Sequence, residues 1–269
     1  MLFLVLAHCF LMFNSDLDLD RLRREGRLSR VEHHVLLSST NDRARELAVK
    51  LSADETALVI ADEQTFGRGR GANRWWTGPG SLACSLIFNP AAQGIRRETS
   101  PLISLSAALS IVDALRPLLP PCPLGLHWPN DVFASDRKLA GILVEAMPDG
   151  KHVLGIGLNV NNRAVEAPAE LRDKAVSVAD LTNQSHSRTD LALRVLAQLW
   201  PNLAQLAANP ADLARGANRA CLQHGRLLVL QIGERRVAGD CEGIADDGAL
   251  VLRTESGIEK FYSGVLVHD

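Results

Sequence analysis

The chain has 269 residues, of which 46% are hydrophobic and 22% are charged, and its formal net charge is -2. This length suits one large domain and one small one, since a domain takes roughly 150 residues. The composition excludes a disordered or fibrous chain, and the small net charge argues against a nucleic-acid partner. Five scattered cysteines without a Cys-x-x-Cys pair argue against disulfides and against a metal held by side chains, so we expect a cytoplasmic protein.

Residues 1–30 are predicted to form an N-terminal extension. Met1–Phe13 is strongly apolar, but no basic residue precedes the apolar stretch and it is too short to span a bilayer. We therefore interpret residues 1–11 as a start-site artefact with Met12 as the initiator, and we expect no membrane association. A short charged helix is predicted over Asp16–Arg24.

Strand and helix signals alternate through residues 31–220, which predicts an α+β domain with helices packed against a mixed sheet. Strands, marked by short apolar runs between turn residues, are predicted at Val31–Ser38, Thr56–Asp62, Ser81–Phe88, Leu124–Trp128, Asp131–Ala134, Lys138–Met147 and Lys151–Val160. Helices, marked by caps and by apolar spacing of three to four, are predicted from Ser39 or Thr40 to about Leu51, over Leu102–Leu118 and over Leu191–Ala207.

Residues 221–269 are predicted to form a separate small domain. From Arg226 onward the sequence consists of short strands divided by turns near residues 233, 247 and 256. Regular short strands with turn signals favour a small barrel of the SH3 type.

One loop segment combines three residue types that suit an anionic ligand with an aromatic part. Gly67–Trp76 contains three glycines, three arginines and two tryptophans, and it has no acidic residue. Glycine lets backbone approach a ligand closely, arginine matches phosphate and carboxylate, and tryptophan offers a flat face. A nucleotide fits this description, although an isolated pair of arginines such as Arg68 and Arg70 is also typical of a solvated basic turn.

A second segment, His127–Glu145, contains the turn Trp128-Pro129-Asn130-Asp131 and then Lys138 before an apolar run. A charge placed against an apolar strand needs a partner or a ligand, and Gly141 would let backbone come close to that ligand. The alternatives are that Lys138 reaches solvent from the end of a hairpin and that Asp131 only fixes the turn.

Together these segments resemble the signature of the biotin–protein ligases. The resemblance continues through Ser39-Thr40-Asn41, Gln64, the segment 155–161 and the segment 242–252, and it spans roughly Val31 to the C-terminus. It implies a catalytic domain related to class II aminoacyl-tRNA synthetases over residues 31–220 and an SH3-like barrel over 221–269. About thirty residues precede Val31, which are too few to hold a winged-helix segment, so the repressor activity of some family members is not expected.

The resemblance implies an ATP-dependent ligase that forms biotinyl-5′-AMP, releases pyrophosphate and transfers biotin to one lysine of the biotin carboxyl carrier protein of acetyl-CoA carboxylase or a related carboxylase. Two anionic reactants must meet in the first step, which calls for preorganised cations. Lys138 and Arg70 are the catalytic candidates for that step. Asp131 is the candidate that receives the amine of the carrier lysine.

The resemblance also assigns binding residues. Those implied for biotin are Ser39, Thr40, Asn41, Gln64, Arg68, Gly69, Arg70, Lys138, Gly141, Gly155 and Gly157. Those implied for ATP are Arg70, Arg74, Trp75, Asn130, Lys138 and Asn159. Mg²⁺ is expected to arrive with ATP and to be held mainly by phosphate oxygens.

Two departures from the family pattern affect the ATP site. Gly71, Ala72 and Asn73 occupy places where many members have a further Gly-Arg, so Arg74 is the candidate substitute. The chain also ends without the terminal arginine of many members. Ser39 and Thr40 can equally serve as helix caps, and Trp76 as a core anchor.

Two other functions stay open at this point. A lipoate or octanoate transferase of the same fold also attaches an acid to a carrier lysine, but the Gly-Arg segment disfavours it. A biotin-binding regulator without catalysis is disfavoured by Lys138. The sequence leaves open the choice of carrier and whether the chain forms a homodimer.

Overall fold

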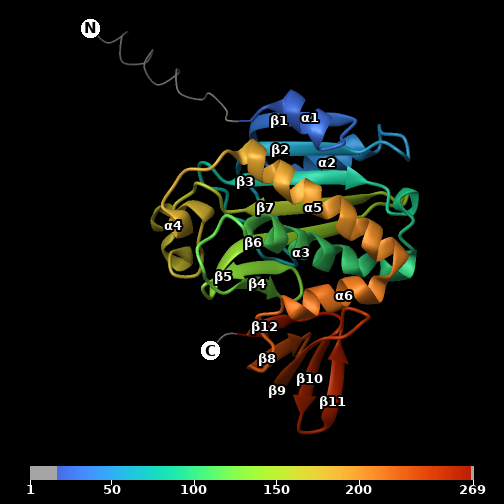
Figure 1. Cartoon of the computed structure of the whole chain (residues 1–269), viewed down its shortest axis with the longest axis vertical. Coiled ribbons are helices and arrows are strands. Elements are labelled where there is room, and N and C mark those ends of the chain that lie inside the picture. Colours follow the sequence, from blue (N-terminus) through green and yellow to red (C-terminus); the bar gives the residue numbers. More distant parts are fainter. Residues whose placement is uncertain (1–16, 268–269) are drawn as a thin grey trace.

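Within residues 17–267, which the computed structural model describes, a seven-stranded mixed sheet forms the centre of the larger domain (Figure 1). The interpretation of residues 1–11 lies outside this range. The strand order is β1-β2-β3-β7-β6-β5-β4, with β1 parallel to β2 and the other neighbours antiparallel. The strands are β1 (Arg30–Leu37), β2 (Ala57–Gln64), β3 (Leu82–Phe88), β4 (Leu124–His127), β5 (Asp131–Ala134), β6 (Arg137–Ala146) and β7 (His152–Leu158). All seven predicted strands are confirmed.

Six α-helices and four short 3₁₀ turns accompany these strands in the described range. The helices are α1 (Leu19–Glu25), α2 (Thr40–Ala48), α3 (Ile103–Leu115), α4 (Val178–Thr182), α5 (Arg188–Ala208) and α6 (Pro210–Arg219), and the turns are Ala91–Gln93, Arg97–Leu102, Ala164–Glu166 and Ala169–Leu171. Helix α5 begins one turn earlier than predicted, because Ser187 caps it by accepting a hydrogen bond from Asp190 N at 3.1 Å. None of these helices is long and apolar enough to cross a membrane.

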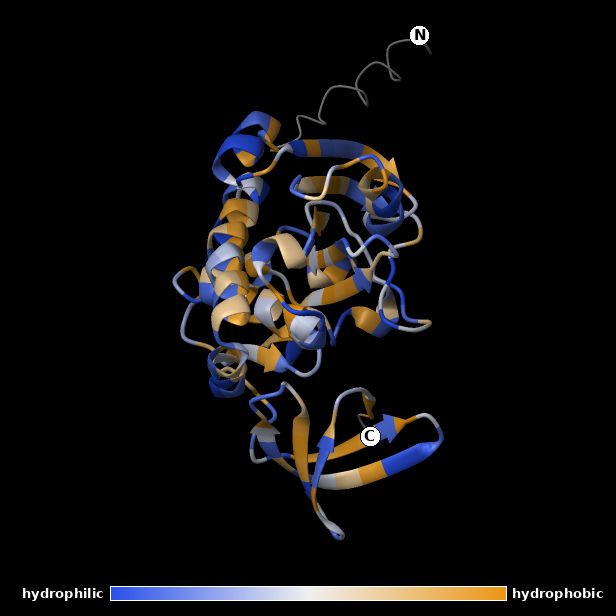
Figure 2. Ribbon diagram, turned by 90° about the vertical axis from the view of Figure 1, so that its right-hand side faces the viewer, coloured by the Kyte–Doolittle hydropathy of each residue, from blue (hydrophilic) through white to orange (hydrophobic). Residues whose placement is uncertain are grey.

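Both faces of the large sheet are covered at β2 and β3, which explains why these two strands are buried nearly throughout. Successive side chains of a strand point to opposite faces. On β2, Leu58 and Ile60 join the main core with α3 and α5, whereas Ala57 and Val59 pack with α2 in a second cluster. Figure 2 shows hydrophobic segments along these central strands.

Helix α1 packs as part of the larger domain, although the sequence placed it in an extension. Leu22 is fully buried in the main core. Asp18 caps α1. Its backbone N also connects this segment to α5, because it donates to Thr189 Oγ1 at 2.8 Å. Trp200 Nε1 of α5 donates to Gly26 O at 3.0 Å. The sequence-based boundary at residue 30 therefore does not separate two packing units.

The C-terminal domain is a five-stranded antiparallel sheet at one end of the molecule (Figures 1 and 2). Its strands, in the spatial order β11-β10-β9-β8-β12, are β8 (Leu227–Ile232), β9 (Arg235–Ile244), β10 (Leu250–Thr254), β11 (Gly257–Phe261) and β12 (Val265–Val267). The predicted fold class, an α+β domain with a mixed sheet followed by a small β domain, is confirmed.

Hydrogen bonds from β4 and the turn after it join the two domains. Leu222 N of the C-terminal domain donates to Leu126 O at 2.9 Å, and next to it Leu126 N donates to Ala220 O, at the end of the larger domain, at 2.7 Å. Trp128 Nε1 donates to Gly248 O at 3.1 Å. The turn that contains the candidate Asn130 and Asp131 is therefore fixed on the C-terminal domain.

A buried ion pair joins the first two strands to α5. Arg188 Nη1 lies 2.8 Å from Asp62 Oδ1, and His33 Nε2 lies 2.9 Å from Asp62 Oδ2. Arg188 is 6% exposed and Asp62 is 8% exposed. Removing one member of such a pair takes a charged partner away from a buried charge, which costs more than the intact pair contributes.

Asp62→Ala is therefore expected to lower the free energy of unfolding by about 3–5 kcal/mol. Asp246→Ala, which removes an exposed partner of Arg215, serves as the control and should cost less than about 1 kcal/mol. Chemical denaturation of both variants measures the difference. Equal losses would show that the Asp62 pair does not stabilise the fold.

Candidate active site

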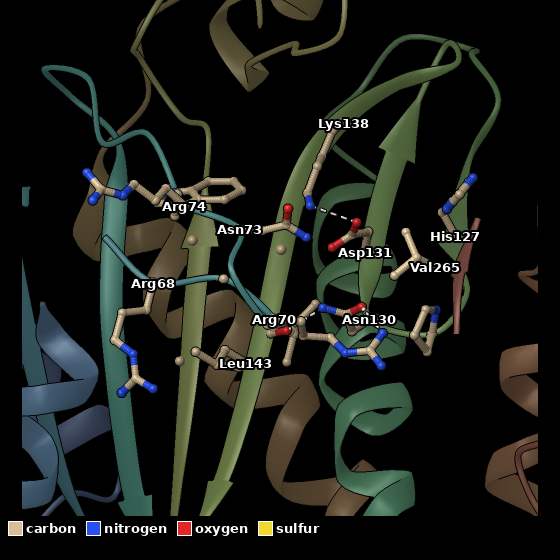
Figure 3. Close-up of a pocket in the computed structure, with 18 of the residues that line it drawn as sticks. Arg68, Arg70, Asn73, Arg74, His127, Asn130, Asp131, Lys138, Leu143 and Val265 are labelled. Atoms are coloured by element: carbon tan, nitrogen blue, oxygen red, sulfur yellow. Dashed lines mark hydrogen bonds and ion pairs between the residues drawn. The ribbon is translucent and has the colours of Figure 1, made fainter. Parts of the chain in front are cut away.

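A cleft of about 460 Å³ lies above the middle of the large sheet, between the Gly-Arg loop (residues 67–75) and β12 of the C-terminal domain (Figure 3). With one exception, every residue that the sequence singled out for biotin, ATP or catalysis lines this cleft. These are Ser39, Thr40, Asn41, Gln64, Arg68, Gly69, Arg70, Arg74, Trp75, Asn130, Asp131, Lys138, Gly141, Gly155 and Gly157.

The exception is Asn159, which is buried behind the cleft. Its Nδ2 donates to Lys138 O at 3.3 Å and to Val176 O at 3.2 Å, and its Oδ1 accepts from Asn162 Nδ2 at 2.9 Å. Both ends of the Asn159 amide are thus used inside the protein. In this structure Asn159 supports the backbone at Lys138, and the nucleotide contact implied by the resemblance stays a prediction.

One end of the cleft is a polar corner lined by Thr40, Asn41 and Gln64 and supported by the fully buried Ser85, which does not line the cleft itself. Thr40 N donates to Gln64 Oε1 at 2.7 Å. Ser85 Oγ lies 2.8 Å from Thr40 Oγ1 and 2.6 Å from Asn41 Oδ1. Four polar side chains in hydrogen-bonding contact within an apolar sheet can form hydrogen bonds with the donors and acceptors of a small polar ring.

The start of α2 supplies two members of the polar corner. Ser39 occupies the N-cap position of α2, but its side chain makes no capping hydrogen bond. The hydroxyl of Ser39 therefore does not perform the capping role that its position suggests. Sequence reasoning missed Ser85, although a serine within the buried run Leu82–Phe88 was a usable signal.

The Gly-Arg loop folds back on itself and its arginines have protein partners. Gly69 N donates to Asn73 O, and Trp75 N donates to Gly67 O, both at 2.9 Å. A Cβ at Gly67 would lie 2.3 Å from Trp75 O, so this crossing requires glycine. Arg68 and Arg70 already have acceptors within the protein.

The arginines of the loop point to different regions (Figure 3). Arg70 Nη1 donates to Asn130 Oδ1 at 3.2 Å, and Asn130 Nδ2 donates to Ile142 O at 2.6 Å. Arg68 points away from Lys138, and Arg74 stacks on the Phe66 ring at 4.1 Å. Arg70 is therefore the loop cation closest in position to the Lys138 region.

Lys138 and Asp131 form an ion pair within the cleft, with Lys138 Nζ 2.7 Å from Asp131 Oδ2 (Figure 3). Both side chains are half-buried. Lys138 thus points into the cleft, contrary to the alternative in which it reaches solvent. Among the described residues, Asp131 Oδ1 is buried and accepts no hydrogen bond. Burial raises the pKa of Asp131 above its ordinary value, although the charges of Lys138 and Arg70 oppose the shift.

Trp75 lies on a patch of sheet that has no side chains. Gly141 and Gly157 are register neighbours on β6 and β7. A Cβ at Gly157 would lie 2.3 Å from Trp75 Cε2, and a Cβ at Gly141 would lie 3.1 Å from Trp75 Cζ3. Lys138 Nζ lies 5.8 Å from the centroid of the same ring. The glycines therefore let the indole rest on the floor of the cleft.

Other residues of the cleft were not foreseen from the sequence. His127 and Phe133 stack with ring centroids 4.3 Å apart and an interplanar angle of 18°. The C-terminal domain adds a wall that includes Gln231 and Val265. The sequence carried no signal for the wall from the C-terminal domain, because it brings together elements that are distant along the chain.

The described part of the chain holds no group of three or more His, Cys, Asp or Glu side chains that could bind a metal ion. Asp131 is the one carboxylate among the described residues that line the cleft, and it accepts from Lys138. These residues do not fit an ion held by protein ligands alone. They are compatible with Mg²⁺ carried by phosphate oxygens.

Comparisons with known proteins agree with this geometry. The sequence matches the biotin/lipoate A/B protein ligase family over residues 34–161 and the biotin protein ligase C-terminal domain over residues 224–268. It is 34% identical over 231 residues to the biotin–acetyl-CoA-carboxylase ligase of Paracoccus denitrificans, covering 81% of this chain and 92% of that protein. The chain belongs to the biotin protein ligase family.

Two further relatives support this membership. The bifunctional ligase/repressor BirA of Bacillus subtilis is 31% identical over 239 residues, covering 86% of this chain and 71% of that protein. The solved structure of biotin protein ligase from Aquifex aeolicus in complex with biotin and ATP matches with a TM-score of 0.77 and 28% identity. That match covers 89% of this chain and 98% of the other.

The packing of Trp75 on Gly157 and Gly141 predicts effects of different size when each glycine is replaced by alanine. Gly157→Ala should displace the Trp75 indole and shift its fluorescence emission to longer wavelength, because the new methyl would overlap the ring. Gly141→Ala, where the contact is looser, should have a smaller effect. Repeating both substitutions in a Trp75→Phe background assigns the signal. An unchanged emission in Gly157→Ala would contradict the placement of Trp75.

Proposed function

We propose that this chain activates biotin with ATP and transfers it to a lysine of a biotin carboxyl carrier protein. The observation that carries the proposal is the Lys138–Asp131 pair, which lies in one cleft with the polar corner and the Gly-Arg loop. A cation for two anionic reactants and a half-buried carboxylate for an incoming amine are the groups that the two steps require.

In the first step a biotin carboxylate oxygen attacks the α-phosphorus of ATP, and pyrophosphate leaves. Lys138 and Arg70 stabilise the negative charge that accumulates as the two anions approach. The polar corner orients the ring of biotin so that its carboxylate faces Lys138. Mg²⁺ supplies additional charge on the phosphates, and Trp75 offers a face to the adenine.

In the second step the amine of the carrier lysine attacks the acyl carbon of biotinyl-5′-AMP, and AMP leaves. The nucleophile must be a neutral amine, although a lysine side chain carries a proton in water. Asp131 Oδ1 is buried without a protein donor among the described residues, so it can receive the ammonium and its proton. The carrier domain of acetyl-CoA carboxylase is the proposed acceptor, because two relatives are named biotin–acetyl-CoA-carboxylase ligases.

The family also includes lipoate ligases, so a lipoate or octanoate substrate is the second candidate. The match to the biotin protein ligase C-terminal domain favours biotin. Pyrophosphate release measured with biotin, lipoate and octanoate in turn separates the candidates. Release with lipoate but not with biotin would overturn the proposal.

Lys138→Ala is expected to slow formation of biotinyl-5′-AMP by roughly a hundredfold or more, because one preorganised cation is lost. The measurement is single-turnover adenylation at saturating biotin and ATP. Lys50→Ala, at an exposed position outside the cleft, is the control and should retain the normal rate. A near-normal rate in folded Lys138→Ala protein would remove Lys138 from the mechanism.

Asp131→Asn is expected to slow transfer to the carrier by about a hundredfold or more while adenylation falls by much less. The amide still fixes the turn and accepts from Lys138, but it cannot take a proton from the amine. Separate assays of the two half-reactions decide the matter. Equal losses in both steps, accompanied by a lower melting temperature, would show that Asp131 is only a turn residue.

The pH dependence of transfer gives a further check on Asp131. Burial raises the pKa of Asp131, so its carboxylate becomes protonated at a higher pH than an exposed aspartate would. Transfer by the wild-type chain should therefore decline as pH falls through this raised pKa. The slower Asp131→Asn variant should lack that acidic decline, and a decline of the same shape in both proteins would assign it to another group.

A further inference from the structure

Glu145 on β6 contacts two segments that the proposed reaction uses separately. Its Oε2 accepts from Asn41 Nδ2 of the polar corner at 2.7 Å. Both carboxylate oxygens also face Arg68 of the Gly-Arg loop, with Oε1 3.0 Å from Nη2 and Oε2 3.2 Å from Nη1. A third and longer contact, 3.4 Å from Oε1, comes from Arg45 Nη1 on α2. One carboxylate on a rigid strand thus joins the corner to the loop.

The contact with Asn41 determines how the Asn41 amide is oriented. A carboxylate only accepts hydrogen bonds, so the NH₂ end of Asn41 must face Glu145. Its oxygen then faces Ser85 Oγ at 2.6 Å. A Cβ at Gly155 would lie 2.2 Å from the same oxygen, so the amide also rests on bare backbone. Glu145 therefore fixes which group of Asn41 the polar corner presents.

The contact with Arg68 holds the loop on the body of the domain. Arg68 has a second carboxylate partner, Asp42, at 2.8 Å. The side chain of Glu145 is 17% exposed, whereas that of Asp42 is 47% exposed, so water screens the Glu145 contact less. Burial lowers the pKa of Arg68, but these two carboxylates more than compensate and raise its pKa above the ordinary value.

Arg68 is a suitable point from which to hold the whole loop. It forms an isolated β-bridge with Arg74, so the two ends of the loop are paired at this position. Arg68 points away from the Lys138–Asp131 pair, and its charge is therefore not placed beside the reacting atoms (Figure 3). Its contacts indicate that it secures the loop.

We propose that Glu145 is a positioning residue that couples the polar corner to closure of the Gly-Arg loop. Biotin in the corner stabilises the orientation of Asn41 that favours Glu145, and Glu145 in turn holds Arg68 and the closed loop. The identity of the ligand rests on the proposed function, whereas the coupling between Asn41, Glu145 and Arg68 does not. Loss of the carboxylate weakens both biotin binding and retention of the closed loop.

The coupling can be tested first without any ligand. Trypsin cleaves after arginine, and the loop contains three. Glu145→Gln should raise the rate of loop cleavage in the full chain by about tenfold, the effect of losing one charged hydrogen bond. Glu46→Gln, which removes an exposed partner of Arg43 on α2, is the matched control and should stay within about twofold of wild type.

A double-mutant cycle identifies the partner. Arg68→Gln removes a cleavage site as well as the contact, so cleavage after Arg70 and Arg74 is followed by mass spectrometry in all four proteins. Glu145→Gln and Arg68→Gln should each accelerate it, and the double variant should be no faster than the faster single variant. Additive effects would overturn the coupling, as would unchanged cleavage in Glu145→Gln protein with a normal melting temperature.

The effect of Glu145 on biotin binding is tested by measuring the KM for biotin and the adenylation rate separately. In Glu145→Gln the KM for biotin should rise about tenfold, with the single-turnover adenylation rate at saturation within about twofold of wild type. Glu145→Asp should restore part of the affinity. A lowered rate with unchanged KM would overturn the positioning role. Failure of the wild-type chain to activate biotin would defeat the proposed function, yet the protease results would still test the coupling.

Discussion

The cleft depends on bare backbone at three positions of two neighbouring strands. Where Gly141, Gly155 and Gly157 carry no Cβ, Trp75 and the Asn41 amide come within contact distance of the sheet. Any side chain at Gly155 or Gly157 would overlap these groups, so the floor could not hold a ring and the polar corner could not close. Helices α3 and α5 pack in the main core on the opposite face, and α2 packs on the cleft face beside the floor, so the strands of the floor are held in place.

Three cations of the site each have a partner within the protein. Lys138 pairs with Asp131, Arg70 donates to Asn130, and Arg68 pairs with Glu145. Each cation therefore has a defined position that does not depend on a ligand, which lowers the cost of organising the site when anions bind. Because these contacts are only partly shielded, a phosphate or carboxylate can exchange with the internal acceptors at modest cost.

The C-terminal domain contributes to the site through position rather than through charge. Hydrogen bonds from Leu126 and Trp128 hold it against the turn that carries Asn130 and Asp131. Val265 on β12 and Gln231 on β8 then close the side of the cleft opposite the Gly-Arg loop. A site built between two domains can exclude water from the reacting groups.

The sequence by itself determined the strands of the large sheet, most of the helices and the β character of the C-terminus. These follow from local signals, since alternation, helical spacing, caps and turn residues act within a few positions. The predicted residues of the cleft came instead from the resemblance of two segments to a known family. Only the tertiary structure decided the rest. Ser85 meets Thr40 from 45 positions away, and Asn41 meets Glu145 from 104 positions away. The tertiary structure also buries Asn159 and brings Val265 to the cleft. Strand order and domain docking place these distant side chains together, and no short segment of sequence encodes either of them.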